Sequence, residues 1–338
     1  MMKKVVTLGE IMLRFSTAAG ERLSQTGQLT VNYGGAEANV AVSLSHFGYD
    51  AFFVSKVPDN ALGQAVDRHL RSHGVRTDYL LKGGERLGTY YLEAGIGERS
   101  AQVTYDRKYS AFSMLEADEI NWVEIFMDAS LFHVSGITLA LSPELRETVL
   151  LAVKKAKELG VKTSFDFNYR AKLWNQQEAG KAIFPLLPFI DICSFGELDA
   201  IYLLGLAEAD ESLSQTERLI HYYSKITEMY PNIQFISSTF RTVISSSNNQ
   251  LQGNLFAQGE LYQSKVHHID PIVDRVGGGD AFASGILTGI LEEFGQQQTV
   301  SFATAASALK HTIHGDCNIF TKEEVFRFAD SAPGKIVR

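Results

Sequence analysis

The sequence predicts an α/β protein built around a mostly parallel sheet. Short runs of β-branched and apolar residues alternate along the chain with longer stretches of helical periodicity. This alternation is typical of parallel strands joined by helices that cover both faces of the sheet. Two regions, 11–33 and 87–107, break the alternation and indicate a second, small β-sheet. The 338 residues fit one large domain with an appended lobe, or two domains, and since no flexible linker is evident, we expect a single domain over residues 1–338.

The strands expected in the central sheet are six short apolar runs. They are Val5–Gly9, Ala51–Val57, Leu131–Gly136, Lys162–Asp166, Asp191–Phe195 and Gln234–Ser238. Two helices are also expected. The stretch Asn39–Phe47 places its apolar residues on one face, and Pro143–Leu159 begins with proline and is followed by Gly160. In sheets of this kind, ligands bind beyond the carboxyl ends of the strands.

The two regions that break the alternation read as strands without intervening helices. Gly88–Glu93 and Ala101–Arg107 flank a turn at Gly95–Ser100, which predicts a β-hairpin. A small sheet formed from 11–33 and 87–107 is suited to be a lid over a substrate. A ribbon at the edge of the molecule that faces only solvent explains the same pattern equally well.

Composition narrows the classes of function. The formal net charge is -8, which argues against nucleic acid as the main partner but not against a small anion held by local arginines. The two cysteines, Cys193 and Cys317, have no metal-ligand spacing and suggest a reducing compartment. The amino-terminal run reads as a strand, not a signal peptide, and no stretch approaches the roughly 18 to 20 apolar residues of a membrane span. We therefore expect a cytoplasmic protein that has no membrane partner.

A glycine-rich turn near the carboxyl end is the first candidate for chemistry. Gly277, Gly278 and Gly279 precede Asp280, and the residues that follow have helical periodicity. Glycines that open a helix allow backbone N–H groups to approach an anion, and the helix dipole favours negative charge there. The dipole is expected to keep Asp280 ionised, so that it can accept a proton. A glycine-rich turn before a buried helix, with no ligand, is the alternative, and the pattern is not a P-loop.

A second glycine pair, Gly34 and Gly35, leads directly into the helix that begins near Asn39. Its backbone N–H groups could meet the polar edge of a substrate, and Asn39 could bind a ligand hydroxyl. Taken alone, the pattern fits a capped tight turn better than a binding site.

The two glycine motifs together resemble the paired signatures of the ribokinase-like (PfkB) carbohydrate kinases. The first is GGAEANVAVSLSHFG at 34–48, and the second is DRVGGGDAFASGIL at 274–287. Their order and separation also match, and the resemblance spans nearly the whole chain. It implies a ribokinase-like three-layer sandwich with a β-sheet lid, ATP and Mg²⁺ as cofactors, Asp280 as catalytic base, and an anion hole at Gly277, Gly278 and Gly279.

Finer matches resemble one subgroup, the 2-keto-3-deoxygluconate kinases. They are Ser135–Thr138, the segment Asp166–Arg170, and His314–Asp316, together with three residues of the lid. The substrate-binding residues that the resemblance implies are Gly34, Gly35, Asn39, Tyr90, Tyr105, Arg107, Ile137, Arg170 and Asp316. A sugar acid carries a carboxylate, which guanidinium groups bind bidentately, whereas a neutral sugar does not need two arginines. For each arginine taken singly, a surface salt bridge is the commoner role.

Two segments depart from the family pattern. Ser194 replaces an asparagine ahead of Glu197, which the resemblance assigns to magnesium, through water. At 237–243 the family has a glycine-containing loop beside the nucleotide, whereas this chain has none there. The residues then expected to donate hydrogen bonds to the nucleotide phosphates are Ser238, Thr239 and Arg241. The nucleotide preference stays open.

The sequence thus predicts an ATP-dependent kinase that phosphorylates the terminal hydroxyl of 2-keto-3-deoxygluconate. A fructokinase- or ribokinase-like kinase of a neutral sugar and a non-catalytic sugar-acid-binding regulator are the alternatives. A dinucleotide oxidoreductase fits poorly, because no strand–GxGxxG–helix fingerprint is present. The gluconate or galactonate stereochemistry is left open, and a homodimer that pairs lids is expected, since exposed sheet edges need cover.

Overall fold

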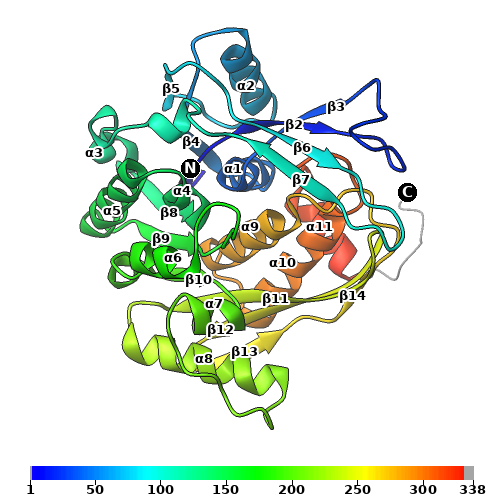
Figure 1. Ribbon diagram of the computed structural model, residues 1–338. Helices are drawn as coiled ribbons and strands as arrows, with labels where there is room; N and C mark the ends of the chain where they lie inside the picture. Colours follow the sequence, from blue (N-terminus) through cyan, green and yellow to red (C-terminus); the bar gives the residue numbers. More distant parts are fainter. Residues whose placement is uncertain (1, 331–338) are drawn as a thin grey trace.

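The structure, a computed structural model, describes residues 2–330 and has the predicted α/β fold (Figure 1). A ten-stranded sheet has the order β13-β12-β11-β10-β9-β8-β1-β4-β5, with β14 paired to β12. Its strands are β1 (Lys4–Leu8), β4 (Asp50–Val57), β5 (Leu80–Lys82), β8 (Ala129–Ser135), β9 (Lys162–Asp166), β10 (Ile192–Ser194), β11 (Phe235–Ser245), β12 (Asn248–Ala257), β13 (Glu260–Gln263) and β14 (His267–Ile269). The pairs from β11 through β10, β9, β8, β1, β4 and β5 are parallel.

The main departure from the sequence prediction lies at β11. Segment 237–243, expected to be a loop, continues the strand and pairs antiparallel with β12, with Ser238 opposite Asn254 and Arg241 opposite Leu251. The expectation of a loop came from the family resemblance and was wrong, because the polar residues of this segment form a strand. Here they lie on a two-stranded extension in which backbone pairing, not apolar alternation, holds the chain. For the same reason the polar strand β12 was not predicted.

Helices cover both faces of the large sheet. They are α1 (Ala36–His46), α2 (Ala61–Ser72), α3 (Trp122–Phe126), α4 (Gly136–Leu141), α5 (Pro143–Glu158), α6 (Gln176–Ile183), α7 (Glu197–Tyr202), α8 (Gln215–Met229), α9 (Gly278–Leu291), α10 (Gln296–Lys310) and α11 (Lys322–Asp330). Successive residues of β1 serve opposite faces: Val6 packs in the core that includes α5 and α8, and Val5 in the core that includes α1, α9 and α10. The result is a three-layer sandwich.

The helix ends follow from local sequence. Helix α5 begins at Pro143, and the side chain of Ser142 accepts a hydrogen bond from the Leu145 N–H at 3.2 Å. Helix α9 begins after Gly277, whose φ of +80° lies in the left-handed region that glycine adopts at little cost. None of the helices within residues 2–330 combines the length and the apolar character needed to cross a bilayer.

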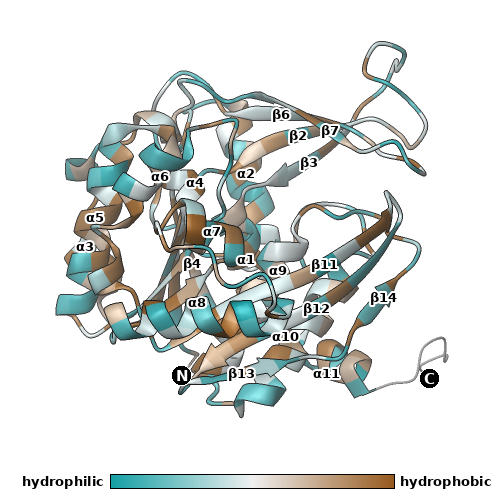
Figure 2. Ribbon diagram, turned by 60° about the horizontal axis from the view of Figure 1, so that its bottom comes forward, coloured by the Kyte–Doolittle hydropathy of each residue, from teal (hydrophilic) through white to brown (hydrophobic). Residues whose placement is uncertain are grey.

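A four-stranded sheet stands off the three-layer body. It contains β2 (Met12–Ser16), β3 (Thr30–Gly34), β6 (Thr89–Glu93) and β7 (Gln102–Asp106), in the order β3-β2-β6-β7. The predicted hairpin is confirmed, with Tyr90 opposite Tyr105 in an antiparallel β6–β7 pair. Figure 2 shows this small sheet on the side of the body to which β11 and β12 also extend.

Candidate active site

A cavity of about 390 Å³ lies between the small sheet and the carboxyl ends of the central strands; we call it the inner cavity. All nine residues that the sequence assigned to a substrate line it, together with Asp280, Gly277 and Gly279. These residues come from segments as distant along the chain as Gly34 and Asp316. The fold therefore brings the two glycine motifs, the small sheet and the Asp166–Arg170 segment to one place.

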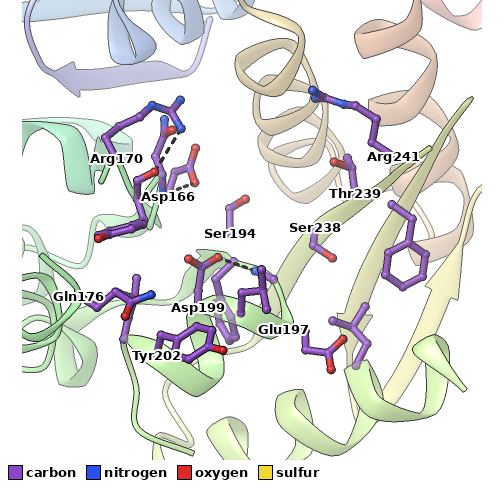
Figure 3. A pocket seen from close by; sticks show the side chains of 18 of the residues that line it. Asp166, Arg170, Gln176, Ser194, Glu197, Asp199, Tyr202, Ser238, Thr239 and Arg241 are labelled. Atoms are coloured by element: carbon purple, nitrogen blue, oxygen red, sulfur yellow. Dashed lines mark hydrogen bonds between the residues drawn. The ribbon is translucent and has the colours of Figure 1, made fainter. Parts of the chain in front are cut away.

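A second cavity of about 740 Å³, the outer cavity, opens beside the first (Figure 3). The residues assigned to a nucleotide and to a metal, Ser238, Thr239, Arg241 and Glu197, line it. Four side chains line both cavities: Asp166, Asn168, Arg170 and Arg241. Because these residues form a shared wall, the two cavities adjoin, and a group bound in one can reach a group bound in the other.

Asp280 is the third residue of α9, and its carboxylate points into the inner cavity. Asn39 Nδ2 donates a hydrogen bond to Asp280 Oδ2 at 2.7 Å. Burial raises the pKa of Asp280 to about 6, against the opposing effects of this hydrogen bond and of the Arg170 guanidinium. The sequence argument considered only the helix dipole. Desolvation outweighs it, so this carboxylate changes its charge near neutral pH.

The three glycines before Asp280 have different surroundings. A Cβ on Gly277 would lie 1.7 Å from the Asp316 carbonyl oxygen, and one on Gly278 would lie 2.4 Å from His311 Cε1, whereas one on Gly279 would meet nothing within 4 Å. The Gly278 N–H is already bonded to Arg275 O at 3.3 Å. Within residues 2–330, the N–H groups of Gly277, Gly279 and Asp280 have no acceptor. These three N–H groups are therefore available to an anion.

Arg107 has a partner that the sequence did not suggest. Its Nε donates to Glu10 Oε2 at 2.8 Å and its Nη2 contacts the same oxygen, with both side chains less than 10% exposed. Glu10 follows β1 and Arg107 follows β7, so the pair joins the body to the small sheet. The positive charge of Arg107 is thus largely neutralised before any substrate binds.

Replacing Arg107 by Gln is expected to destabilise the protein by about 3 kcal/mol, because it leaves a buried carboxylate at Glu10 without its counter-ion. The double variant Glu10→Gln, Arg107→Gln is expected to regain most of that loss. Denaturant unfolding of both variants measures the difference. A single variant as stable as wild type would show that the pair does not hold the small sheet to the body.

Arg170, in contrast, forms no ion pair within residues 2–330, although its charge acts on the nearby carboxyl groups of Asp166, Asp199 and Asp280. Its side chain donates only to the Tyr169 carbonyl oxygen, at 3.3 Å, and no carboxylate among residues 2–330 lies within ion-pair distance. It ends a turn in which Asn168 has a φ of +40°, in the left-handed region that asparagine adopts more readily than most residues. The structure thus presents a free guanidinium to both cavities.

Asp316 is held by residues of the small sheet. Tyr90 Oη donates to its Oδ2, and Arg14 Nε lies 3.2 Å from its Oδ1. Arg14 also binds Asp274, at 2.5 Å. Burial raises the pKa of Asp316. Arg14 and Asp274 were not predicted, since nothing in the local sequence indicates that they meet.

Glu37 was also missed, although it lines the inner cavity. Its Oε1 accepts hydrogen bonds from Ser135 Oγ at 2.7 Å, Thr138 Oγ1 at 2.8 Å and the Ser135 N–H at 3.0 Å. Burial raises the pKa of this carboxyl group. The contacts fasten the start of α1 to the β8–α4 turn, and so position Asn39 relative to Ile137.

The residues fit a magnesium ion only through water. No group of three or more acidic, histidine or cysteine side chains within residues 2–330 is arranged to hold a metal. Glu197 Oε1 accepts from Arg218 Nε at 2.7 Å. Burial, and then the neighbouring Asp280, raises the pKa of Asp166 to about 7. Since Mg²⁺ keeps several waters and takes its other ligands from phosphates and one or two carboxylates, Asp166 and Glu197 suffice for an ion carried by a nucleotide.

Comparison with known proteins agrees with this geometry. The model of the pfkB family of carbohydrate kinases matches residues 2–323. The chain is 35% identical over 328 residues to a 2-dehydro-3-deoxygalactonokinase of Haloferax volcanii, which covers 97% of this chain and 96% of the relative. A crystal structure of the 2-dehydro-3-deoxygluconokinase of Thermotoga maritima is similar at 42% identity and a TM-score of 0.93, covering 97% of this chain and 100% of that one. A pfkB family carbohydrate kinase of Listeria grayi has 44% identity, the same TM-score and the same coverage of both chains.

Proposed function

Because this chain belongs to the pfkB family of carbohydrate kinases, we propose that it phosphorylates the terminal hydroxyl of a 2-keto-3-deoxy sugar acid, with ATP as donor. The observation that carries the proposal is the presence, in one cavity, of a half-buried carboxylate at Asp280 and of the Arg170 guanidinium, which forms no ion pair within residues 2–330. The first suits a hydroxyl that must lose a proton, and the second suits a carboxylate. Names of the relatives cover gluconate- and galactonate-derived acids, so both epimers are candidates.

The sugar acid would lie in the inner cavity between Arg170 and Asp280. Gly34 and Gly35 line the cavity, and both positions require glycine because a Cβ on Gly34 would lie 2.0 Å from Asp316 Oδ2 and one on Gly35 would lie 1.8 Å from the Glu10 carbonyl oxygen. Tyr90 and Tyr105, with ring centroids 5.9 Å apart, form the wall from the small sheet. We assign the carboxylate to Arg170 first. Arg107 contributes through the edge of its guanidinium that Glu10 leaves free.

The nucleotide would lie in the outer cavity beside Ser238, Thr239 and Arg241. Asp280 would accept the proton of the attacking hydroxyl, and the N–H groups of Gly279 and Asp280 would donate to the phosphoryl oxygens. The Gly278 N–H is excluded from the anion hole, because it is engaged by the Arg275 carbonyl oxygen, whereas the Gly277 N–H has no acceptor within residues 2–330. A magnesium ion beside Asp166 and Glu197 would neutralise phosphate charge. The small sheet would exclude water from the reacting groups.

The reaction is expected to require the ionised form of Asp280, whose pKa is raised to about 6. At pH 5 about a tenth of the enzyme would have the active carboxylate, and at pH 7 about nine tenths. The rate should therefore fall on acidification through pH 6. A pH profile of kcat/KM for the sugar acid measures this. A profile flat down to pH 4.5 would contradict the role of Asp280.

A measurement without nucleotide separates the enzyme's titration from that of ATP. The folded-state pKa of Asp280 lies above its ordinary value of 3.8, so ionisation lowers stability. Relative to Asp280→Asn, wild type should lose stability as pH rises from 4 to 7. If the stability of wild type relative to Asp280→Asn instead rises between pH 4 and pH 7, the pKa of Asp280 is not raised in the folded protein.

The proposed function itself is tested by measuring phosphoryl transfer from ATP to the sugar acid. ADP formation that depends on a 2-keto-3-deoxy sugar acid supports it, and binding of the acid without ADP formation would favour the regulatory alternative.

A further inference from the structure

Three guanidinium groups at the meeting point of the two cavities lack a carboxylate partner. Arg170 and Arg241 line both cavities, and Arg275 lines the inner one. Within residues 2–330, none of the three has an ion pair. The other arginines of the inner cavity and of the layer behind it, Arg107 and Arg14, are each bound to buried carboxylates. Unlike Arg107 and Arg14, these three arginines have no carboxylate within ion-pair distance in the described part of the chain.

Arg275 is held in place by one of its nitrogens. Its Nη2 donates to the Ser246 carbonyl oxygen at 3.1 Å, and lies 3.4 Å from Asn249 Oδ1 and 3.5 Å from the Ser245 carbonyl oxygen. These acceptors lie at the end of β11, in the turn that follows it and at the start of β12. Nε and Nη1 have no acceptor in the described part of the chain. The side chain is therefore anchored at one edge while the rest of its fork is free to bind a ligand.

Arg241 reaches the same cavity from β11. Its side chain has no hydrogen bond within residues 2–330. Arg241 and Arg275 both line the inner cavity, and burial and then the charge of Arg275 lower the pKa of Arg241. Like charges side by side are unfavourable unless an anion lies between them. Figure 3 shows Arg241 across the outer cavity from Arg170, so Arg241 is separate from the arginine assigned to the sugar acid.

The position of the pair matches the path of a transferred phosphoryl group. Arg275 lies two residues before Gly277 in the chain, and both line the inner cavity with Gly279 and Asp280. Arg241 extends the same wall into the outer cavity. A phosphoryl group that passes from a nucleotide in the outer cavity to a hydroxyl beside Asp280 must pass beside Arg241 and Arg275.

We propose that Arg275 and Arg241 together bind the phosphoryl group during transfer, in place of the glycine loop that this chain lacks at 237–243. The inference rests on the proposed kinase function. In the step, the bond from the terminal phosphorus to the ADP oxygen breaks and a bond to the substrate hydroxyl oxygen forms. The hydroxyl proton passes to Asp280. Both arginines keep their protons and donate hydrogen bonds to the equatorial oxygens.

Arginine suits this role better than lysine. Its planar fork can hold backbone carbonyl oxygens at one edge and a phosphate at the other, whereas a lysine ammonium is a single point of charge. The variant Arg275→Lys should therefore keep the positive charge but be unable to hold the carbonyl oxygens and the phosphate at the same time.

The test compares Arg275→Gln, Arg275→Lys and Arg241→Gln with Arg68→Gln, which removes an exposed arginine of α2 outside both cavities. Each of the first three is expected to lower kcat by about 10- to 100-fold. The KM for the sugar acid should change little, and the control should match wild type. Guanidinium ion added to Arg275→Ala should restore part of the lost kcat, which a structural role would not allow.

The outcomes separate the two claims. If wild type transfers phosphate and Arg275→Gln and Arg241→Gln keep full kcat, the arginine pair is wrong and the proposed function stands. Lowered kcat with an equally lowered affinity for the sugar acid, measured by calorimetry without nucleotide, would also overturn the pair, because it would indicate damage to the inner cavity. If wild type transfers nothing to any sugar acid, the proposed function fails, and the pair fails with it.

Discussion

Replacing Asp280 by Asn is expected to lower kcat by about 10³-fold or more while the fold stays intact. The substitution keeps the size of the side chain and an oxygen that can accept the Asn39 hydrogen bond, now 2.7 Å long. What it removes is the ability to accept a proton from the attacking hydroxyl, and general base catalysis of this kind contributes about 10²- to 10⁴-fold. The KM for the sugar acid should stay within about threefold, since few ground-state contacts are lost.

Stability provides the control for this variant. Because burial raises the pKa of Asp280 to about 6, the ionised carboxylate is unfavourable in the folded protein above that pH. Asp280→Asn should then unfold at an equal or higher temperature than wild type at pH 8. Steady-state kinetics and thermal unfolding on the same preparation measure both effects. Retention of more than about a tenth of wild-type kcat would mean that another group acts as base.

Replacing Arg170 by Gln is expected to reduce kcat/KM for the sugar acid by about 10²- to 10³-fold. Arg170 has no carboxylate partner in the described chain and ends a turn stiffened by the positive φ of Asn168. A charge-assisted, bidentate contact with a carboxylate is worth about 3 kcal/mol, or somewhat more in a site shielded from water. Because the side chain makes one weak contact within the protein, its loss should leave stability nearly unchanged.

The decisive comparison uses two substrates. For an analogue whose carboxylate is replaced by an uncharged amide, Arg170→Gln and wild type should differ by less than about threefold. The variant Arg107→Gln serves as the contrast, since it is expected to lower stability as well as activity. If Arg170→Gln lowers turnover of the acid and of the amide equally, then Arg170 does not bind the substrate carboxylate.

Much of the site could be predicted because its residues lie within two contiguous motifs. Gly34, Gly35 and Asn39 share one stretch of chain, and Gly277, Gly279 and Asp280 share another, so their proximity within each motif follows from local structure. The six central strands were predicted because buried parallel strands are almost continuously apolar. The meeting of the motifs was inferred from a family resemblance, and the structure brings both to the inner cavity.

The parts that were not predicted depend on contacts between distant segments. The pairing of Arg107 with Glu10 crosses from the small sheet to the end of β1, and that of Arg14 with Asp316 spans most of the chain. A sequence shows the charges but not which of them meet. The raised pKa of Asp280 was not predicted for the same reason, because burial is a property of the whole fold. Segment 237–243 was misread because its strand is held by backbone pairing to β12.

The measurement that tests the central claim most directly is ADP formation by wild type with ATP and Mg²⁺ over a panel of acceptors. The panel holds 2-keto-3-deoxygluconate, its galactonate epimer, gluconate, fructose and ribose. Turnover restricted to the keto acids, with phosphate on the terminal carbon of the product, is the predicted result. Turnover on fructose or ribose at a comparable kcat/KM would contradict the assignment of Arg170 to a carboxylate, and with it the proposed class of substrate.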